Sequence, residues 1–262
     1  MKSDYLYHYT SIHTLALILK NRKLRFNNLL NVDDPEEAES EDLELIGRHC
    51  LISCWTDNSE DVLPMWNMYT PDMKGVRIGM RKYPFKKYIY NKGEMHFTEN
   101  VESYINFQSN YVKKVSIAPN CPLLVKVEYT EDESLLRPKI RRQTDKTINI
   151  SYAEIGHYKR TCWTFQKEYR YIITTAPWSM EEIENMKASK ESIDIINRVD
   201  DEKDNHFCSE IFLDLSDEAF DDMEILLAPK TSDSEYIIVQ ALLDKYCQNA
   251  NIKIEKSRIR VR

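Results

Sequence analysis

Residues 5–26 carry the feature that most limits the possible folds, because a strand pattern turns there at once into a helix pattern. Aromatic and apolar residues lead into His8, and apolar residues then recur at helical spacing over 12–19. Thr10 or Ser11 is the natural N-cap of this helix. A strand that ends at His8 places the histidine at the rim of a sheet, where it either packs against the helix or meets a ligand.

Short strand-like and helix-like segments alternate along the rest of the chain. Residues 50–55 are apolar at nearly every position, which is typical of a buried strand, whereas 83–117 show no clear periodicity. No linker or internal repeat divides the sequence, so residues 1–262 predict one α+β domain with a mixed or antiparallel sheet and flanking helices. The expected strands are 24–26, 50–55, 75–80, 123–129, 168–173, 211–215, 223–228 and 252–261, and the expected helices are 12–23, 63–69, 151–159, 178–196 and 235–248.

Two of the expected helices begin with the pattern of a capping box. Ser179 precedes Glu182 by three residues, and Ser232 precedes Glu235 in the same way. In a capping box, the serine and the glutamate side chains each accept a hydrogen bond from a backbone N–H of the first turn. These pairs therefore predict where both helices start.

The composition is that of a soluble globular protein. Hydrophobic residues make up 42% of the 262 residues and charged residues 30%. The apolar runs are too short to span a bilayer, and the N-terminus lacks the apolar segment of a signal peptide, so we expect a cytoplasmic protein without membrane contact. Six cysteines without paired spacing predict reduced thiols.

The sequence lacks the motifs of several common cofactor-binding, catalytic and metal sites. The five glycines form neither a dinucleotide-binding G-x-G-x-x-G nor a phosphate-binding P-loop, and there is no G-x-S-x-G nucleophile elbow. His49, Cys50 and Cys54 are the nearest approach to a metal cluster, but no second Cys or His pair has ligand spacing. The sequence therefore predicts no metal site.

Charge is distributed in local clusters. The net charge of −7 disfavours a broad grip on nucleic acid, because that grip depends on neutralising phosphates. The basic segment 137–142 is the exception and mildly favours a nucleic-acid acceptor over a protein acceptor. Residues 36–44 contain six acids and no base, and we interpret them as a solvated surface.

A set of polar and aromatic residues near the ends of predicted strands forms the candidate site. Tryptophan and tyrosine can stack on a flat heterocycle, histidine and threonine can bond a sugar hydroxyl, and a carboxylate can stabilise positive charge on an anomeric carbon. These are the groups needed to cleave an N-glycosidic bond. In the alternative interpretation the aromatic residues belong to the core, Asp34 caps a turn, and Glu168 pairs with Arg170. The candidate residues are His8, Tyr9, Thr10, Asp34, Trp66, Tyr69, Glu168 and Arg170.

A series of short motifs along nearly the whole chain resembles a large bacterial family that is catalogued as a domain of unknown function. The sequence departs from the family pattern where Trp55 replaces phenylalanine, Tyr169 replaces tryptophan and Asp33 replaces asparagine. The motifs are Tyr7-His8-Tyr9-Thr10-Ser11, Asn31 to Glu36, Ser53-Cys54-Trp55, Met65 to Tyr69 before Gly75-Val76, Val127-Glu128-Tyr129, and Trp163 with Lys167-Glu168-Tyr169-Arg170.

The opening of the chain is more distantly similar to the ADP-ribosyltransferase fold. This resemblance implies a split sheet and binding of NAD, with a first-strand histidine on a ribose hydroxyl, an aromatic residue on nicotinamide and a late-strand glutamate that assists transfer. By order and type, these roles match His8, Tyr69 and Glu168.

Three hypotheses for function follow. The first is an ADP-ribosyltransferase-like enzyme that binds NAD, a small-molecule nucleotide, and transfers ADP-ribose to a macromolecule or to water. His8 and Thr10 would hold the ribose, Trp66 or Tyr69 the nicotinamide, and Arg170 a phosphate or Glu168. The second is a non-catalytic ligand-binding or sensor module of a phage-defence or mobile-element system. The third is a metal-dependent nucleotide or nucleic-acid hydrolase that uses His8, Asp34 and Glu168.

Overall fold

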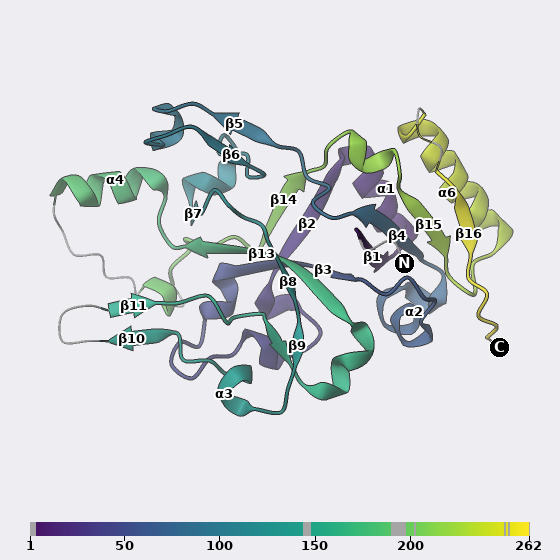
Figure 1. Ribbon diagram of the computed structural model, residues 1–262, viewed down its shortest axis with the longest axis horizontal. Helices are drawn as coiled ribbons and strands as arrows, with labels where there is room; N and C mark the ends of the chain where they lie inside the picture. Colours follow the sequence, from purple (N-terminus) through teal and green to yellow (C-terminus); the bar gives the residue numbers. More distant parts are fainter. Residues whose placement is uncertain are drawn as a thin grey trace.

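The computed structural model describes residues 4–143, 148–189, 198–201, 203–248, 250 and 252–261, and its centre is a ten-stranded sheet with helices packed around it (Figure 1). The protein is thus α+β, as predicted. The helices are α1 Ile12–Asn21, α2 Leu63–Tyr69, α3 Glu133–Leu136, α4 Met180–Ser189 and α6 Asp233–Tyr246. The short 3-10 helices are η1 Leu29–Asn31, η2 Pro35–Ala38, η3 Ile46–His49, η4 Pro71–Met73, η5 Glu94–His96, η6 Asn110–Lys113, η7 Thr161–Gln166 and η8 Glu218–Phe220. The strands are β1 Tyr5–Thr10, β2 Lys23–Asn28, β3 Cys50–Thr56, β4 Val76–Arg81, β5 Tyr88–Tyr90, β6 Val101–Ser103, β7 Ser116–Ile117, β8 Leu123–Lys126, β9 Glu128–Tyr129, β10 Arg141–Gln143, β11 Ile148–Ile150, β12 Tyr158–Lys159, β13 Glu168–Ala176, β14 Glu210–Asp214, β15 Glu224–Leu227 and β16 Ile254–Lys256.

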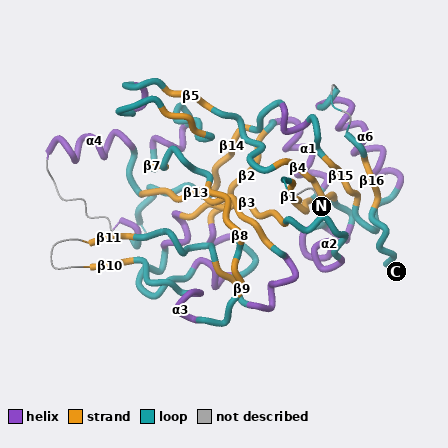
Figure 2. The backbone as a smooth tube through the Cα atoms, in the orientation of Figure 1, coloured by secondary structure: helices purple, strands orange, loops and turns teal. Residues whose placement is uncertain are grey.

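The central sheet is mostly antiparallel. Its strand order is β14-β2-β3-β1-β4-β15-β16, and β13 branches from β3 to carry β7 and β8. Only the last pair of the main path, β15 and β16, runs parallel. In Figure 2 the strands converge at the middle of the molecule, with α6 at one end and α4 and the β10–β11 hairpin at the other.

The sheet splits along one edge of β3. On the opposite edge, β13 pairs with β3 over its whole length, from Glu168↔Thr56 to Thr174↔Cys50. On the edge where the sheet splits, β3 has two partner strands. Strand β2 pairs with residues 51 and 52, and β1 pairs only with Thr56. Among the described strands, none pairs with residues 53–55 on this edge. The sheet therefore opens between β1 and β2.

The opening strand is longer than predicted. All six residues of β1 pair with β4, so the strand continues past His8 to Thr10. Ser11 is the N-cap of α1, and its side chain accepts a hydrogen bond from the Thr14 N–H at 3.0 Å. His8 therefore lies inside the strand rather than at its end, and it is accessible because the sheet splits beside it.

Both capping boxes are confirmed. The Ser179 N–H donates to Glu182 at 2.8 Å and the Glu182 N–H donates back to Ser179 at 3.1 Å. The Ser232 and Glu235 box opens α6 in the same way. The predicted helix 63–69 has these bounds in the structure. Of the predicted helix 178–196, residues 190–196 lie outside the described part of the chain.

Three expectations for secondary structure were wrong. Residues 151–159 form turns and the strand β12 instead of a helix, because Gly156 takes a left-handed φ of 75° and β12 pairs with β9. The predicted strand 123–129 is two strands that pair with different partners, because β8 pairs with β13 whereas β9 pairs with β12. The last strand covers only Ile254–Lys256 of the predicted 252–261.

None of the helices in the described part of the chain has both the length and the apolar character needed to cross a membrane.

Candidate functional site

A cavity of about 290 Å³ lies where the sheet splits. Strands β1, β2 and β3 form one side of it, and residues from the η1–η2 loop, α2, β12, η7 and β13 complete it. Five of the eight predicted site residues line this cavity, although up to 162 positions separate them: they are His8, Tyr9, Tyr69, Glu168 and Arg170. The other polar lining residues include Arg25, Asn27, Asn31, Asp33, Glu37, Lys159 and Gln166.

His8 bridges the split with its side chain. Its Nδ1 lies 2.8 Å from the carbonyl oxygen of Cys54, one of the β3 residues that none of the described strands pairs on this edge. A carbonyl can only accept, so Nδ1 carries the proton and Nε2 is left as an acceptor. Burial lowers the pKa of His8, and the bond to Cys54 only partly opposes this. At neutral pH, His8 therefore presents an uncharged ring with one free lone pair.

Four charged side chains form a buried cluster at the cavity wall, which we call the buried tetrad: Glu37, Lys159, Glu168 and Arg170. Lys159 Nζ lies 2.9 Å from Glu37 Oε1 and 3.1 Å from Glu168 Oε2. Arg170 donates through Nε to Glu168 Oε1 at 2.6 Å and also contacts Glu37. Its Nη1 donates to the carbonyl of Gly156 at 2.8 Å. Each cation of the tetrad therefore contacts both carboxyl groups.

The pKa values of the two carboxyl groups of the tetrad are shifted in opposite directions. Burial alone would raise the pKa of Glu168, but the charges of Arg170 and Lys159 outweigh burial and lower it. Burial raises the pKa of Glu37, where Arg170 and Lys159 offset it only in part and Glu168 adds to the rise. Two carboxyl groups that share a site commonly separate in this way. Glu168 is the ionised member of the pair, and Glu37 is the one that protonates more readily.

Gln166 connects the aromatic side of the cavity to the tetrad. Its Nε2 donates to the Tyr69 hydroxyl at 2.5 Å, while its Oε1 accepts from Lys159 Nζ at 2.8 Å. Burial raises the pKa of Tyr69, and the nearby Asp33 carboxylate raises it further. Tyr69 is therefore a neutral phenol whose ring is held in place beside the ionised Glu168.

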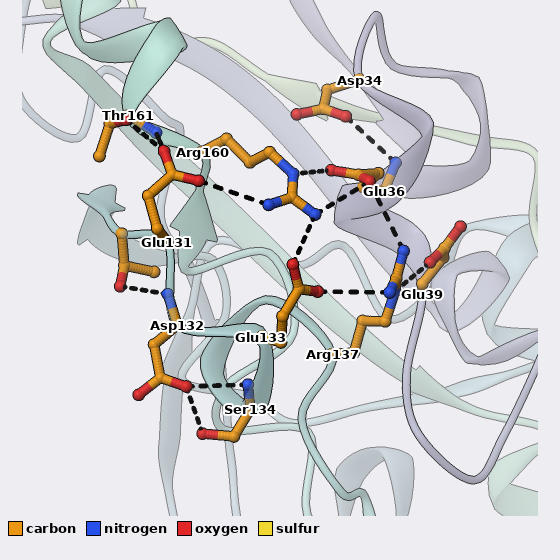
Figure 3. Close-up of polar contacts among 11 residues, drawn as sticks. Asp34, Glu36, Glu39, Glu131, Asp132, Glu133, Ser134, Arg137, Arg160 and Thr161 are labelled. Atoms are coloured by element: carbon orange, nitrogen blue, oxygen red, sulfur yellow. Dashed lines mark hydrogen bonds and ion pairs between the residues drawn. The ribbon is translucent and has the colours of Figure 1, made fainter.

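Three predicted residues lie outside the cavity lining. Trp66 is completely buried, packs edge-on against Tyr9 with ring centroids 4.7 Å apart, and donates its Nε1–H to Asp61. It belongs to the core and is not available to stack on a ligand. Thr10 is also buried at the end of β1. Asp34 accepts a hydrogen bond from the Glu36 N–H at 3.1 Å and so caps η2, as the alternative interpretation predicted (Figure 3).

Glu37, Lys159 and Gln166 were missed from the sequence. Glu37 lies in the acidic run that we predicted to be solvated, yet its side chain is 1% exposed. Lys159 lies in the segment wrongly predicted as a helix. A pair of glutamates in an acidic run carries no local sign that one of them is buried. The sequence gave only a weak signal for this contact: two consecutive bases, Lys159-Arg160, are opposite in charge to two consecutive acids, Glu36-Glu37.

Two of the four bases in the basic segment 137–142 form ion pairs with acids. Arg137 lies 2.5 Å from Glu39 and 3.3 Å from Glu133, and Lys139 lies 3.4 Å from Glu41. Figure 3 shows Arg137 and Arg160 surrounded by Glu36, Glu39, Glu131 and Glu133. We call these six residues the surface network. Its acids already occupy the two arginines.

A scan against protein-family models and searches of curated proteins and of solved structures find no match to this chain. The function proposed below therefore rests on the geometry of its own residues and on the resemblance of its motifs.

Proposed function

We propose that the cavity binds the nicotinamide–ribose half of NAD and that the protein is an ADP-ribosyltransferase-like enzyme, which acts on a macromolecular acceptor or on water in the cytoplasm. One observation supports this most. His8, Tyr69 and Glu168, the three residues that the resemblance matches to ribose, nicotinamide and transfer, come from β1, α2 and β13 and line one cavity.

The chemistry of the cavity fits this substrate. His8 Nε2 accepts a hydrogen bond from a ribose hydroxyl, and the Tyr69 ring lies against the nicotinamide. When the bond between the ribose C1′ and nicotinamide breaks, its electron pair leaves with the neutral nicotinamide. The ionised Glu168 stabilises the positive charge that develops on the ribose. The acceptor oxygen or nitrogen then bonds to C1′ and releases a proton.

A thermal-shift titration with NAD and with nicotinamide tests the binding step. A ligand that binds only the native state raises the melting temperature. We expect a saturable shift with NAD that His8→Ala abolishes. The matched control is His13→Ala, because His13 is an exposed residue of α1 that does not line the cavity. An unchanged NAD shift in His8→Ala would contradict the assigned site.

Release of nicotinamide from NAD tests the catalytic step. We expect Glu168→Gln to bind NAD and to release nicotinamide at least about a hundredfold more slowly, since it removes the charge that stabilises the transition state. Full turnover by this variant would rule out the mechanism.

A second candidate function is favoured by the surroundings of Glu168. Lys159 and Arg170 engage both of its oxygens, and the residue is 4% exposed. A carboxylate held in this way suits a non-catalytic binding or sensor module, for example in a phage-defence system. This function predicts binding of NAD without release of nicotinamide by the wild-type protein.

No observation favours the hydrolase. Asp34, which that hypothesis needs beside His8 and Glu168, caps η2 and does not line the cavity.

A further inference from the structure

We propose that Asp33 makes the cavity selective for a positively charged ring, so that the site binds the oxidised pyridinium form of NAD in preference to NADH, whose ring is uncharged. This inference rests on the proposed function. It assigns the choice between the two redox forms to a residue that the sequence analysis did not place among the site residues.

Asp33 is the accessible acid of the cavity lining. The lining that the structure describes contains three acids, of which Glu37 and Glu168 are buried and Asp33 is exposed. Asp33 lies in the loop between η1 and η2, and its carboxylate is close enough to the Tyr69 hydroxyl to raise the pKa of that phenol. Asp33 therefore borders the ring on which the nicotinamide is proposed to lie, with its own side chain open to a ligand.

The other charged side chains of the described lining are matched by partners. Within the buried tetrad, each cation contacts both carboxyl groups. Arg25 lies 3.1 Å from Glu210, which is outside the lining. Among the described residues, no base forms an ion pair with Asp33, and its neighbour Tyr69 is a neutral phenol. Asp33 therefore contributes an unmatched negative charge at the aromatic end of the cavity.

An unmatched carboxylate distinguishes ligands by the charge of the ring that they place beside it. The nicotinamide ring of NAD carries one positive charge and that of NADH carries none, whereas the carboxamide, ribose and phosphates are the same in both. Attraction between opposite charges a few ångströms apart in a solvated setting corresponds to roughly a fivefold change in affinity. The attraction ends when the C1′–nitrogen bond breaks, because the electron pair leaves the nicotinamide uncharged. Asp33 thus favours binding of the substrate over retention of the product.

The test is calorimetric titration of the wild type and Asp33→Asn with NAD and with NADH. We expect the wild type to bind NAD roughly fivefold more tightly than NADH at low salt. Asp33→Asn keeps the shape of the side chain and removes its charge, so NAD should bind about as weakly as NADH, while binding of NADH changes little. Because Asp33 is exposed, the wild-type preference should also shrink in about 1 M NaCl, where screening acts within roughly 3 Å.

The matched control is Asp57→Asn. Asp57 is an exposed acid directly after β3 that does not line the cavity, so its loss changes the net charge of the protein equally. We expect this variant to keep the wild-type preference for NAD.

The possible results separate this inference from the proposed function. Equal or tighter binding of NADH by the wild type overturns the role of Asp33 and leaves the NAD site in place. A preference for NAD that persists in Asp33→Asn also overturns it, because ring shape and not charge then decides. Equal weakening of both nucleotides in the variant overturns it too, since Asp33 would then contact a group that both share. Failure of the wild type to bind either nucleotide overturns this inference and the proposed function together.

Discussion

The buried tetrad and the surface network contain two pairs of neighbouring residues, Glu37 beside Glu36 and Lys159 beside Arg160, yet the two clusters differ in their surroundings. Glu37 and Lys159 have side chains that are 1% and 4% exposed, whereas Glu36 and Arg160 beside them are 32% and 27% exposed. In each segment one residue is buried and its neighbour is partly exposed: Glu37 and Lys159 face the interior, and Glu36 and Arg160 face the surface. In the interior, desolvation makes each charge depend on its partners, while at the surface water and salt replace a lost partner at little cost.

The largest effect is expected from breaking the tetrad. In Arg170→Met the carboxyl groups of Glu37 and Glu168 lose their shared guanidinium and remain buried. Loss of one member of a buried ion pair typically costs about 3–5 kcal/mol, so we expect the free energy of unfolding to fall by this amount in urea denaturation. Arg81→Met, which removes an exposed ion pair with Asp222, is the control and should change little. A near-wild-type Arg170→Met would show that the tetrad is not coupled as the distances indicate.

The pH dependence of stability separates the two carboxyl groups of the tetrad. The folded-state pKa of Glu168 is lowered, so its stabilisation is present above its unfolded value of 4.5 and is lost as pH falls from there toward about 2. Each pKa unit corresponds to about 1.4 kcal/mol, which limits this term to about 3 kcal/mol. The pKa of Glu37 is raised, so its contribution is present below 4.5 and is lost as pH rises above it.

Two variants test these opposite dependences of stability on pH. Measured as unfolding free energy against pH, Glu168→Gln should lose less stability than the wild type below pH 4.5, and Glu37→Gln should lose less above pH 4.5. If both variants keep the wild-type slopes, the two carboxyl groups do not titrate as described.

The smallest effect is expected from the surface network. Arg160→Gln removes contacts to Glu36, Glu131 and Glu133, all partly exposed. We expect a small fall in melting temperature at low salt that disappears in about 1 M NaCl, where screening acts within roughly 3 Å. If the melting temperature of the variant stays below that of the wild type in high salt, Arg160 supports the tetrad structurally and not only by surface electrostatics.

Local patterns decided much of the fold. The helix of α1, the proline-led α2 and both capping boxes depend on residues within a few positions of one another, so their signals are complete in the sequence. The pairing of Glu168 with Arg170 was also foreseeable, because residues two apart on a strand share a face. His8 and Tyr69 were candidates by residue type, and the resemblance gave them roles beside Glu168; all three line the cavity.

Only the tertiary structure decided which charged and aromatic residues are buried, and where the site opens. Glu37 and Glu36 are alike in sequence, and the packing of η2 against β12 alone makes one a wall of the cavity and the other a surface residue. Trp66 was predicted to stack on a ligand because it is a tryptophan, but the fold places it in the core against Tyr9. The split of the sheet depends on β1 and β2 sharing one edge of β3, a competition between segments far apart in the chain. Local propensity carries no information on such long-range pairing, which is why the sequence determined the elements with strong local signals, whereas the tertiary structure determined the short strands and the site.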